Sequence, residues 1–129
     1  MFPIQVENLY PCGWNDCLER ANQEKTDGTH PALMASVENL EDYDIVYLGY
    51  PNWWYSCPMA IFSFLDENDL TGKQIYLFCS HGTGGLASSV LDISAALPDA
   101  ELSDHVFDVY DEDVASAKDE IVKWLESIQ

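Results

Sequence analysis

Basic side chains are scarce in this sequence. Its 129 residues include 5 lysines and arginines against 23 aspartates and glutamates, which gives a formal net charge of −18 at pH 7. A surface this negative repels phosphate backbones, so we expect no nucleic-acid partner. Cationic partners stay open, because the acidic surface would steer them toward the chain, and plain solubility explains the charge equally well.

Long hydrophobic runs and paired cysteines are also missing. No apolar stretch approaches the roughly 20 residues that a membrane span needs, and the N-terminus lacks the basic region and apolar core of a signal peptide. We therefore expect a cytoplasmic protein with no membrane partner. The four cysteines form no C-x-x-C pair and have no zinc spacing, which predicts free thiols and no metal site. Cys79 is expected in the core, and Cys57 lies on a suspected site loop.

Hydrophobic patterning predicts an α/β fold in one domain, 1–129. Unbroken apolar runs rich in β-branched and aromatic residues are typical of parallel strands that are covered on both faces. The expected strands are 44–50, 74–80 and, as a more broken outer strand, 104–110. Helices are expected over 58–69, 86–97 and 111–128. This alternation with short connections predicts a doubly wound parallel sheet.

The N-terminal part of the chain is less regular. Phe2, Ile4 and Val6 alternate with other residues, which predicts a half-buried strand over 1–6. Pro3 cannot donate to a β-ladder, so this strand belongs at a sheet edge. A helix is expected over 14–25, followed by a loop with at most a short helical turn.

An aromatic loop, PNWWYSC (51–57), follows the first apolar strand. Ligands bind at the carboxyl ends of strands in open parallel sheets. Two adjacent tryptophans cannot both point into the core from one backbone direction, so at least one ring should be exposed or face a ligand. The flat rings of Trp53, Trp54 and Tyr55 suit a flat aromatic ligand by stacking. Packing or an oligomer contact is the alternative.

A glycine-rich loop, SHGTGGL (80–86), follows the next strand. Gly82, Gly84 and Gly85 permit positive φ and let main-chain N–H groups approach a ligand closely. The loop is neither G-x-G-x-x-G nor a Walker sequence, and a flexible turn is the simpler explanation. His81 is either a structural hydrogen-bonding residue or a functional one. No Ser/His/Asp set has a recognisable spacing, so we assign no catalytic residue.

Together these loops resemble those of the flavodoxin-like flavoproteins. The resemblance is to a branch with Y-P-x-W-W before a P-M helix and F-C-[ST]-H-G-x-x-G after the next strand. It is strongest over 43–93 and extends through IVKWLESI and, more weakly, to FPIQVENLYP. It implies a three-layer α/β/α fold with strand order 2-1-3-4-5 that binds flavin mononucleotide (FMN) and moves electrons or a hydride through it.

The same resemblance implies which residues contact the FMN. Those implied to flank the isoalloxazine ring are Pro51, Asn52, Trp53 and Trp54. Those implied to line its polar edge, where main-chain N–H groups tune the redox potential, are Ser80, His81, Gly82, Thr83, Gly84 and Gly85. Tyr55 and Ser56 replace the small residues usual in the family, and Tyr55 would either narrow the flavin slot or stack in it.

The resemblance further implies that one part of the family's domain is missing from this chain. The missing part is the central first strand, the phosphate-cradling S/T-x-T-G-N-T loop and the first helix. We therefore expect a truncated domain with weakened FMN binding, and an exposed sheet edge at 44–50 that favours a homodimer. Met1 is then either an internal methionine of a longer chain or the start of a split protein.

Two functions follow from these observations. The first is an FMN-binding redox protein, either an electron carrier or an NAD(P)H- or quinone-type oxidoreductase, with a redox partner protein or a small quinone-like substrate. The alternative is a non-catalytic flavodoxin remnant or split half that binds no flavin and self-associates through its exposed sheet edge.

Overall fold

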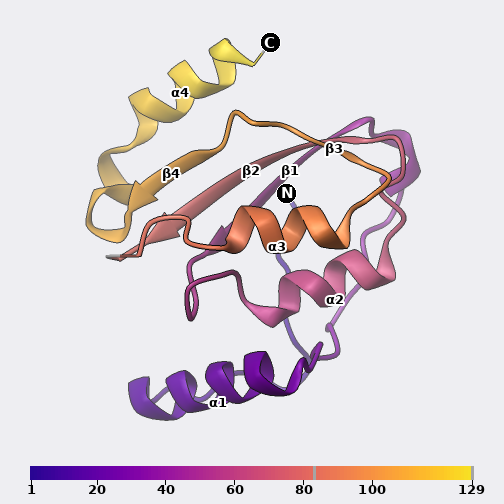
Figure 1. Cartoon of the computed structure of the whole chain (residues 1–129). Coiled ribbons are helices and arrows are strands. Elements are labelled where there is room, and N and C mark those ends of the chain that lie inside the picture. The colour runs from indigo at the N-terminus through magenta and orange to yellow at the C-terminus, as the bar shows by residue number, and fades with distance from the viewer. Residues whose placement is uncertain (83, 129) are drawn as a thin grey trace.

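The computed structural model describes residues 1–82 and 84–128. Its elements in chain order are α1 (Trp14–Asp27), η1 (Leu40–Asp42), β1 (Ile45–Pro51), α2 (Met59–Glu67), β2 (Gln74–His81), α3 (Ser89–Ala96), β3 (Glu101–Leu102), β4 (Phe107–Tyr110), η2 (Asp111–Ser116) and α4 (Lys118–Ser127). The strands form one sheet, with α2 and α3 on one side and α4 on the other (Figure 1). The predicted α/β architecture is confirmed.

All strand pairs in the sheet are parallel. β1 pairs with β2 along its whole length, from Ile45↔Gln74 to Pro51↔Ser80. β3 pairs with the beginning of β2 and β4 with its end, so two short strands share the other side of β2. The outer strand expected over 104–110 is therefore shorter than predicted, and β3 precedes it.

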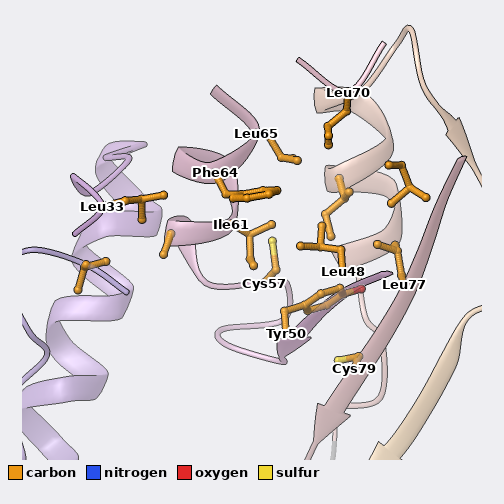
Figure 2. Packing of buried hydrophobic residues seen from close by; sticks show 14 residues of the cluster. Leu33, Leu48, Tyr50, Cys57, Ile61, Phe64, Leu65, Leu70, Leu77 and Cys79 are labelled. Atoms are coloured by element: carbon orange, nitrogen blue, oxygen red, sulfur yellow. The ribbon is translucent and has the colours of Figure 1, made fainter. Parts of the chain in front are cut away.

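The hydrophobic core lies between the sheet and the helices α2 and α3. Ile75 and Leu77 of β2 and Ile93 of α3 are completely buried. Ile61 and Phe64 project from α2 toward Leu48 and the rest of this cluster (Figure 2). α2 begins directly after Pro58, whose fixed φ suits a helix start. Burial of this apolar surface fixes α2 against the sheet and so fixes the loop that precedes it.

α4 packs on the opposite face of the sheet. The ring of Trp124 lies 5.6 Å from that of Phe107 and 6.3 Å from that of Phe78, between ring centroids. Its indole N–H donates to the carbonyl of His105 (2.8 Å). Tyr47 and Phe78 are nevertheless 46% and 41% exposed. The α4 side of the sheet is thus only partly covered.

The N-terminal segment, residues 1–10, does not form the predicted strand over 1–6. Its alternation does set burial, because Phe2 and Ile4 are half-buried and Val6 is buried while the residues between them are exposed. Within the described residues, its one β-bridge joins Val6 to Leu33. A β-ladder needs a continuous main-chain partner. β1 does not supply one to residues 1–10, because an apolar cavity lies between β1 and this segment. Pro3 also lacks the N–H that a ladder would use.

The remaining helices largely follow the predictions. α1 ends at Gly28, whose φ of 68° is typical of a helix C-terminus. The loop after it contains the short η1, as expected. The helices predicted over 86–97 and 111–128 start later than expected, at Ser89 and Lys118, and η2 precedes the last one. In the described ranges, no helix combines the length and apolarity required to cross a membrane.

Candidate functional site

The aromatic loop (51–57) and the glycine-rich loop (80–86) meet at the carboxyl edge of the sheet. Pro51 and Ser80 are paired at the ends of β1 and β2. Asn52 then makes two bonds across the gap: its main-chain N–H donates to the Ser80 carbonyl (2.8 Å), and its Nδ2 donates to the Gly85 carbonyl (2.7 Å). Asn52 therefore holds the two loops in a fixed relative position.

The aromatic loop contains a tight turn with an unusual backbone. The N–H and C=O groups of Trp53 and Ser56 bond reciprocally at 3.1 Å, which closes a two-residue turn. Its central residues, Trp54 and Tyr55, have φ values of 51° and 65°. Turns of this kind normally contain Asn or Gly, because a positive φ costs other residues about 1–2 kcal/mol. Such strain clusters at functional sites, which makes the turn a candidate.

The three aromatic rings of the turn point in different directions. The Trp53 ring packs edge-on against Tyr10, with centroids 5.0 Å apart. The indole N–H of Trp54 donates to the carbonyl of Leu18 in α1 (3.0 Å). Both tryptophans are half-buried, whereas Tyr55 is 70% exposed. Each tryptophan is thus anchored by the N-terminal part of the chain, and Tyr55 presents its ring outward.

Gly84 and Gly85 of the glycine-rich loop have no side chains of their own to shield their main-chain groups. A Cβ on Gly84 would lie 3.0 Å from Asn52 Nδ2, so the close approach of the loops favours glycine there. Gly85 has a φ of 60°, in the left-handed region. Among the described residues, the N–H groups of Gly84 and Gly85 donate to no partner. Gly82 is exposed, and Thr83 lies outside the described residues.

His81 turns its side chain away from the aromatic loop. The residue is only 5% exposed, and its Nε2 lies 2.8 Å from Asp108 Oδ2 in β4. Its ring also packs edge-on against Tyr110, with centroids 4.8 Å apart. The imidazole therefore ties β2 to β4, while the main chain of His81 leads into the glycine-rich loop.

Asp92 supports the aromatic loop through hydrogen bonds, and it was not among the residues predicted for the site. Ser56 Oγ donates to Asp92 Oδ2 (2.5 Å), and the N–H of Ser88 donates to the Tyr55 carbonyl (3.0 Å). Asp92 lies in the first turn of α3, where the helix dipole stabilises a carboxylate. An acidic residue near a helix start was the one available signal.

The charged and titratable groups near the loops do not form a catalytic set. Lys25 of α1 donates to the Trp54 carbonyl, which places one positive charge at the aromatic loop. Burial raises the pKa of the Cys57 thiol to about 12 and that of Cys79 to about 11, so both are protonated at neutral pH. Over residues 1–82 and 84–128, no cluster of His, Cys, Asp or Glu has the composition of a metal site.

This arrangement is suited to binding rather than to acid–base chemistry. It combines an exposed flat ring, main-chain donors without a partner among the described residues, and a rigid connection between the loops that carry them. Flat heteroaromatic molecules with acceptor atoms along one edge match these features, because they stack on aromatic rings and accept hydrogen bonds from N–H groups.

Comparison with known proteins identifies a family. A family model described as flavodoxin matches residues 5–128. Flavodoxin 1 of Escherichia coli K12 and flavodoxin 1 of Salmonella typhimurium LT2 are each 40% identical to this chain over 53 residues. Those residues are 38% of this chain and 30% of each relative, so the matched region spans less than a third of these relatives.

Solved structures share the fold. A candidate flavoprotein from Bacteroides eggerthii DSM 20697 superposes with a TM-score of 0.81 at 27% identity, over 98% of this chain and 79% of that one. A flavoprotein from Lactobacillus acidophilus NCFM, solved in complex with FMN, superposes with a TM-score of 0.67 at 16% identity, over 91% of this chain and 76% of that one. At this lower identity the likeness concerns the fold alone.

Proposed function

This chain belongs to the flavodoxin family, and we propose that it is an FMN-binding redox protein. The observation that carries the proposal is the bond from Asn52 Nδ2 to the Gly85 carbonyl. It joins a strained aromatic turn to a loop in which the N–H groups of Gly84 and Gly85 have no partner in the described part of the chain. The FMN bound to the Lactobacillus acidophilus flavoprotein adds support through the shared fold.

Each loop would hold a different part of the cofactor. The residues that would flank the isoalloxazine ring are Pro51, Asn52, Trp53, Trp54 and Tyr55. The residues that would line its polar edge, mainly through main-chain groups, are Ser80, His81, Gly82, Thr83, Gly84 and Gly85. FMN, once bound, would supply the reversible uptake of electrons, and donors along its polar edge would set its potential.

The ring, rather than the phosphate, would supply most of the affinity of these 129 residues. The net charge of −18 opposes the binding of any anion. Lys25 is the cation that the described contacts place at the aromatic loop, and it already donates to the Trp54 carbonyl. Each charge-assisted hydrogen bond contributes roughly 1.5–3 kcal/mol. A phosphate that makes few of them therefore adds little to the binding free energy.

The test is a titration of FMN and of riboflavin, which lacks the phosphate, followed by quenching of flavin fluorescence. We expect saturable quenching at micromolar concentrations and dissociation constants within about tenfold of each other, because a phosphate without charge partners adds about 1.4 kcal/mol at most. Tyr55→Leu should weaken both. Tyr43→Leu is the matched control, since Tyr43 is also exposed (59%) but precedes the opposite end of β1.

Two results would contradict the proposal. The first is the absence of both quenching and a change in flavin absorbance at micromolar protein. The second is an equal loss of affinity in the Tyr55 and Tyr43 variants, which would separate flavin binding from the aromatic loop.

A further inference from the structure

Three strained residues lie where the aromatic loop contacts the start of α3. Trp54 and Tyr55 of the loop have positive φ, and so does Ala87, at 45°, shortly before α3. They are three of the four non-glycine residues with positive φ in the described part of the chain. This conformation costs free energy and persists only where surrounding contacts hold it. The contacts between the loop and α3 therefore have to offset strain on both sides.

The main-chain carbonyl of Tyr55 is held from the α3 side by Ser88. It accepts a hydrogen bond from the Ser88 N–H (3.0 Å), and Ser88 Oγ lies 2.8 Å from it. Ser88 directly precedes α3, and this helix is fixed to the sheet through the completely buried Ile93. The carbonyl of a strained residue is thus attached to a helix that cannot easily move.

Asp92, one turn further along α3, bonds to residues on both sides of this contact. Its carboxylate oxygen Oδ2 accepts from Ser56 Oγ (2.5 Å) and lies 2.9 Å from Ser88 Oγ. Ser56 directly follows Tyr55 and is only 3% exposed, so its hydroxyl needs a partner within the protein. The Ser88 hydroxyl has one hydrogen, and the Ser88 N–H keeps the Tyr55 carbonyl bonded when that hydrogen turns to Asp92.

The Asp92 carboxylate acts as a hydrogen-bond acceptor rather than as half of an ion pair. Within residues 1–82 and 84–128, no basic side chain forms a salt bridge with it. An unpaired negative charge is unfavourable in a chain with a net charge of −18, and hydroxyl donors and the N-terminal dipole of α3 offset this cost. Both bonds end on one oxygen, so an amide oxygen in the same place could accept them, whereas a methyl group could not.

We propose that Asp92 is a positioning residue of the flavin site. Through the hydroxyls of Ser56 and Ser88, it holds the aromatic turn in the strained conformation that directs the Tyr55 ring outward, toward the bound flavin. The part of this inference that concerns flavin rests on the proposed function. The effect on the turn requires no flavin and can be measured in the chain alone.

Amide hydrogen exchange of the flavin-free chain measures the turn directly. The reporters are the N–H groups of Ser56 and Ser88, which bond to the carbonyls of Trp53 and Tyr55. Asp92→Ala should accelerate exchange at both by at least about tenfold, because the strained turn loses bonds to a charged acceptor. Asp92→Asn keeps one oxygen and should stay within about twofold of the unsubstituted chain. Unchanged exchange in Asp92→Ala would overturn the proposal.

A reference amide and a control variant separate this effect from a general loss of stability. The N–H of Gln74 bonds to the Asp44 carbonyl (2.9 Å) at the opposite end of the sheet, and Asp92→Ala should not change its exchange. Ser63→Ala is the control, since Ser63 is also buried and its hydroxyl bonds to the distant Pro31 carbonyl (2.5 Å). It should not accelerate the reporters selectively. Equal acceleration of reporters and reference in Asp92→Ala would overturn the positioning role.

Titration with FMN connects the turn to the cofactor. Asp92→Ala should weaken FMN binding about fivefold to tenfold, because the relaxed turn then predominates and only a fraction of the molecules can bind. Asp92→Asn should restore most of the affinity. In a Tyr55→Leu background, Asp92→Ala should have little further effect, because the ring that it positions is gone. An undiminished effect in that background would overturn the proposal.

Failure of this inference and failure of the proposed function give different results. FMN binding that is equally tight in Asp92→Ala overturns the positioning role and leaves the proposed function standing. A chain that binds no FMN overturns the proposed function together with the flavin part of the inference. Exchange at the Ser56 and Ser88 amides then still supports or overturns the role of Asp92 in the turn.

Discussion

The side-chain amide of Asn52 donates a 2.7 Å hydrogen bond to the main-chain carbonyl of Gly85, 33 residues further along the chain. This contact joins the loops that follow β1 and β2. It leaves the Gly85 N–H free of a partner among the described residues and holds the strained Trp54–Tyr55 turn beside it. The geometry of the candidate site therefore depends in part on one neutral side chain.

Replacing Asn52 tests that dependence. Asn52→Ala removes the Nδ2 donor and should weaken FMN binding about fivefold to tenfold, because one hydrogen bond contributes about 1 kcal/mol. Asn68→Ala is the control: its Nδ2 makes a similar 2.8 Å bond to Phe64, at the end of α2. Fluorescence titration measures both. An equal loss of affinity in the two variants would show a general loss of stability instead.

Substitution of Tyr55 in the turn should raise the stability of the fold and lower its affinity for FMN. Tyr55→Gly relieves a φ of 65° and removes a side chain that is already 70% exposed. We expect the free energy of unfolding to rise by up to about 1 kcal/mol while FMN affinity falls, because the strain disappears together with the ring. Urea denaturation and flavin titration measure the two effects. A variant that loses stability would contradict the assignment of strain to this residue.

Gly49 is required by its neighbour on β2. A Cβ at this position would lie 2.1 Å from the Phe78 ring, so Gly49→Ala must displace that ring from its place beside Trp124. The expected loss is about 1–3 kcal/mol of unfolding free energy, as for other overpacked sites. Phe78→Leu in the same chain should restore part of it. Additive losses in the double variant would contradict a direct clash.

Stability should fall at alkaline pH. Burial raises the pKa of Cys57 from 9.0 to about 12 and that of Cys79 from 9.0 to about 11. Above pH 9 the unfolded chain releases these protons while the folded chain retains them, so ionisation favours unfolding. The stability present below pH 9 is then lost progressively as the pH rises toward 11 and beyond. The urea midpoint should decrease over this range, and less steeply in Cys57→Ala/Cys79→Ala; identical slopes would contradict the assignment to these thiols.

Much of the fold could be predicted because its signals are local. The strands expected over 44–50 and 74–80 occur at 45–51 and 74–81, because short apolar runs rich in β-branched and aromatic residues favour strands. The prediction of a strand over 1–6 was wrong, because strand pairing depends on segments that are distant in the sequence. Its alternating pattern is local and does set burial, but pairing requires a neighbouring strand that no local pattern can supply.

In the candidate site, too, local features could be predicted and contacts between distant segments could not. Its two loops could be located from the sequence, because each follows an apolar strand whose carboxyl end lies at one edge of a parallel sheet. The contacts that shape them join segments far apart in the chain: Asn52 with Gly85, Ser56 with Asp92, and Trp54 with Leu18. Nothing in the spacing of these residues indicates that they meet.

The sequence by itself determined most of the segments that become strands and helices, and so which loops lie together at the carboxyl edge. The tertiary structure alone decided that Trp53 and Trp54 turn toward the N-terminal part of the chain while Tyr55 turns outward, and that one edge of β1 faces an apolar cavity. The physical reason is that local patterns fix hydrogen bonding and burial within a segment. Ring direction and strand partnership depend instead on which distant segments pack against it.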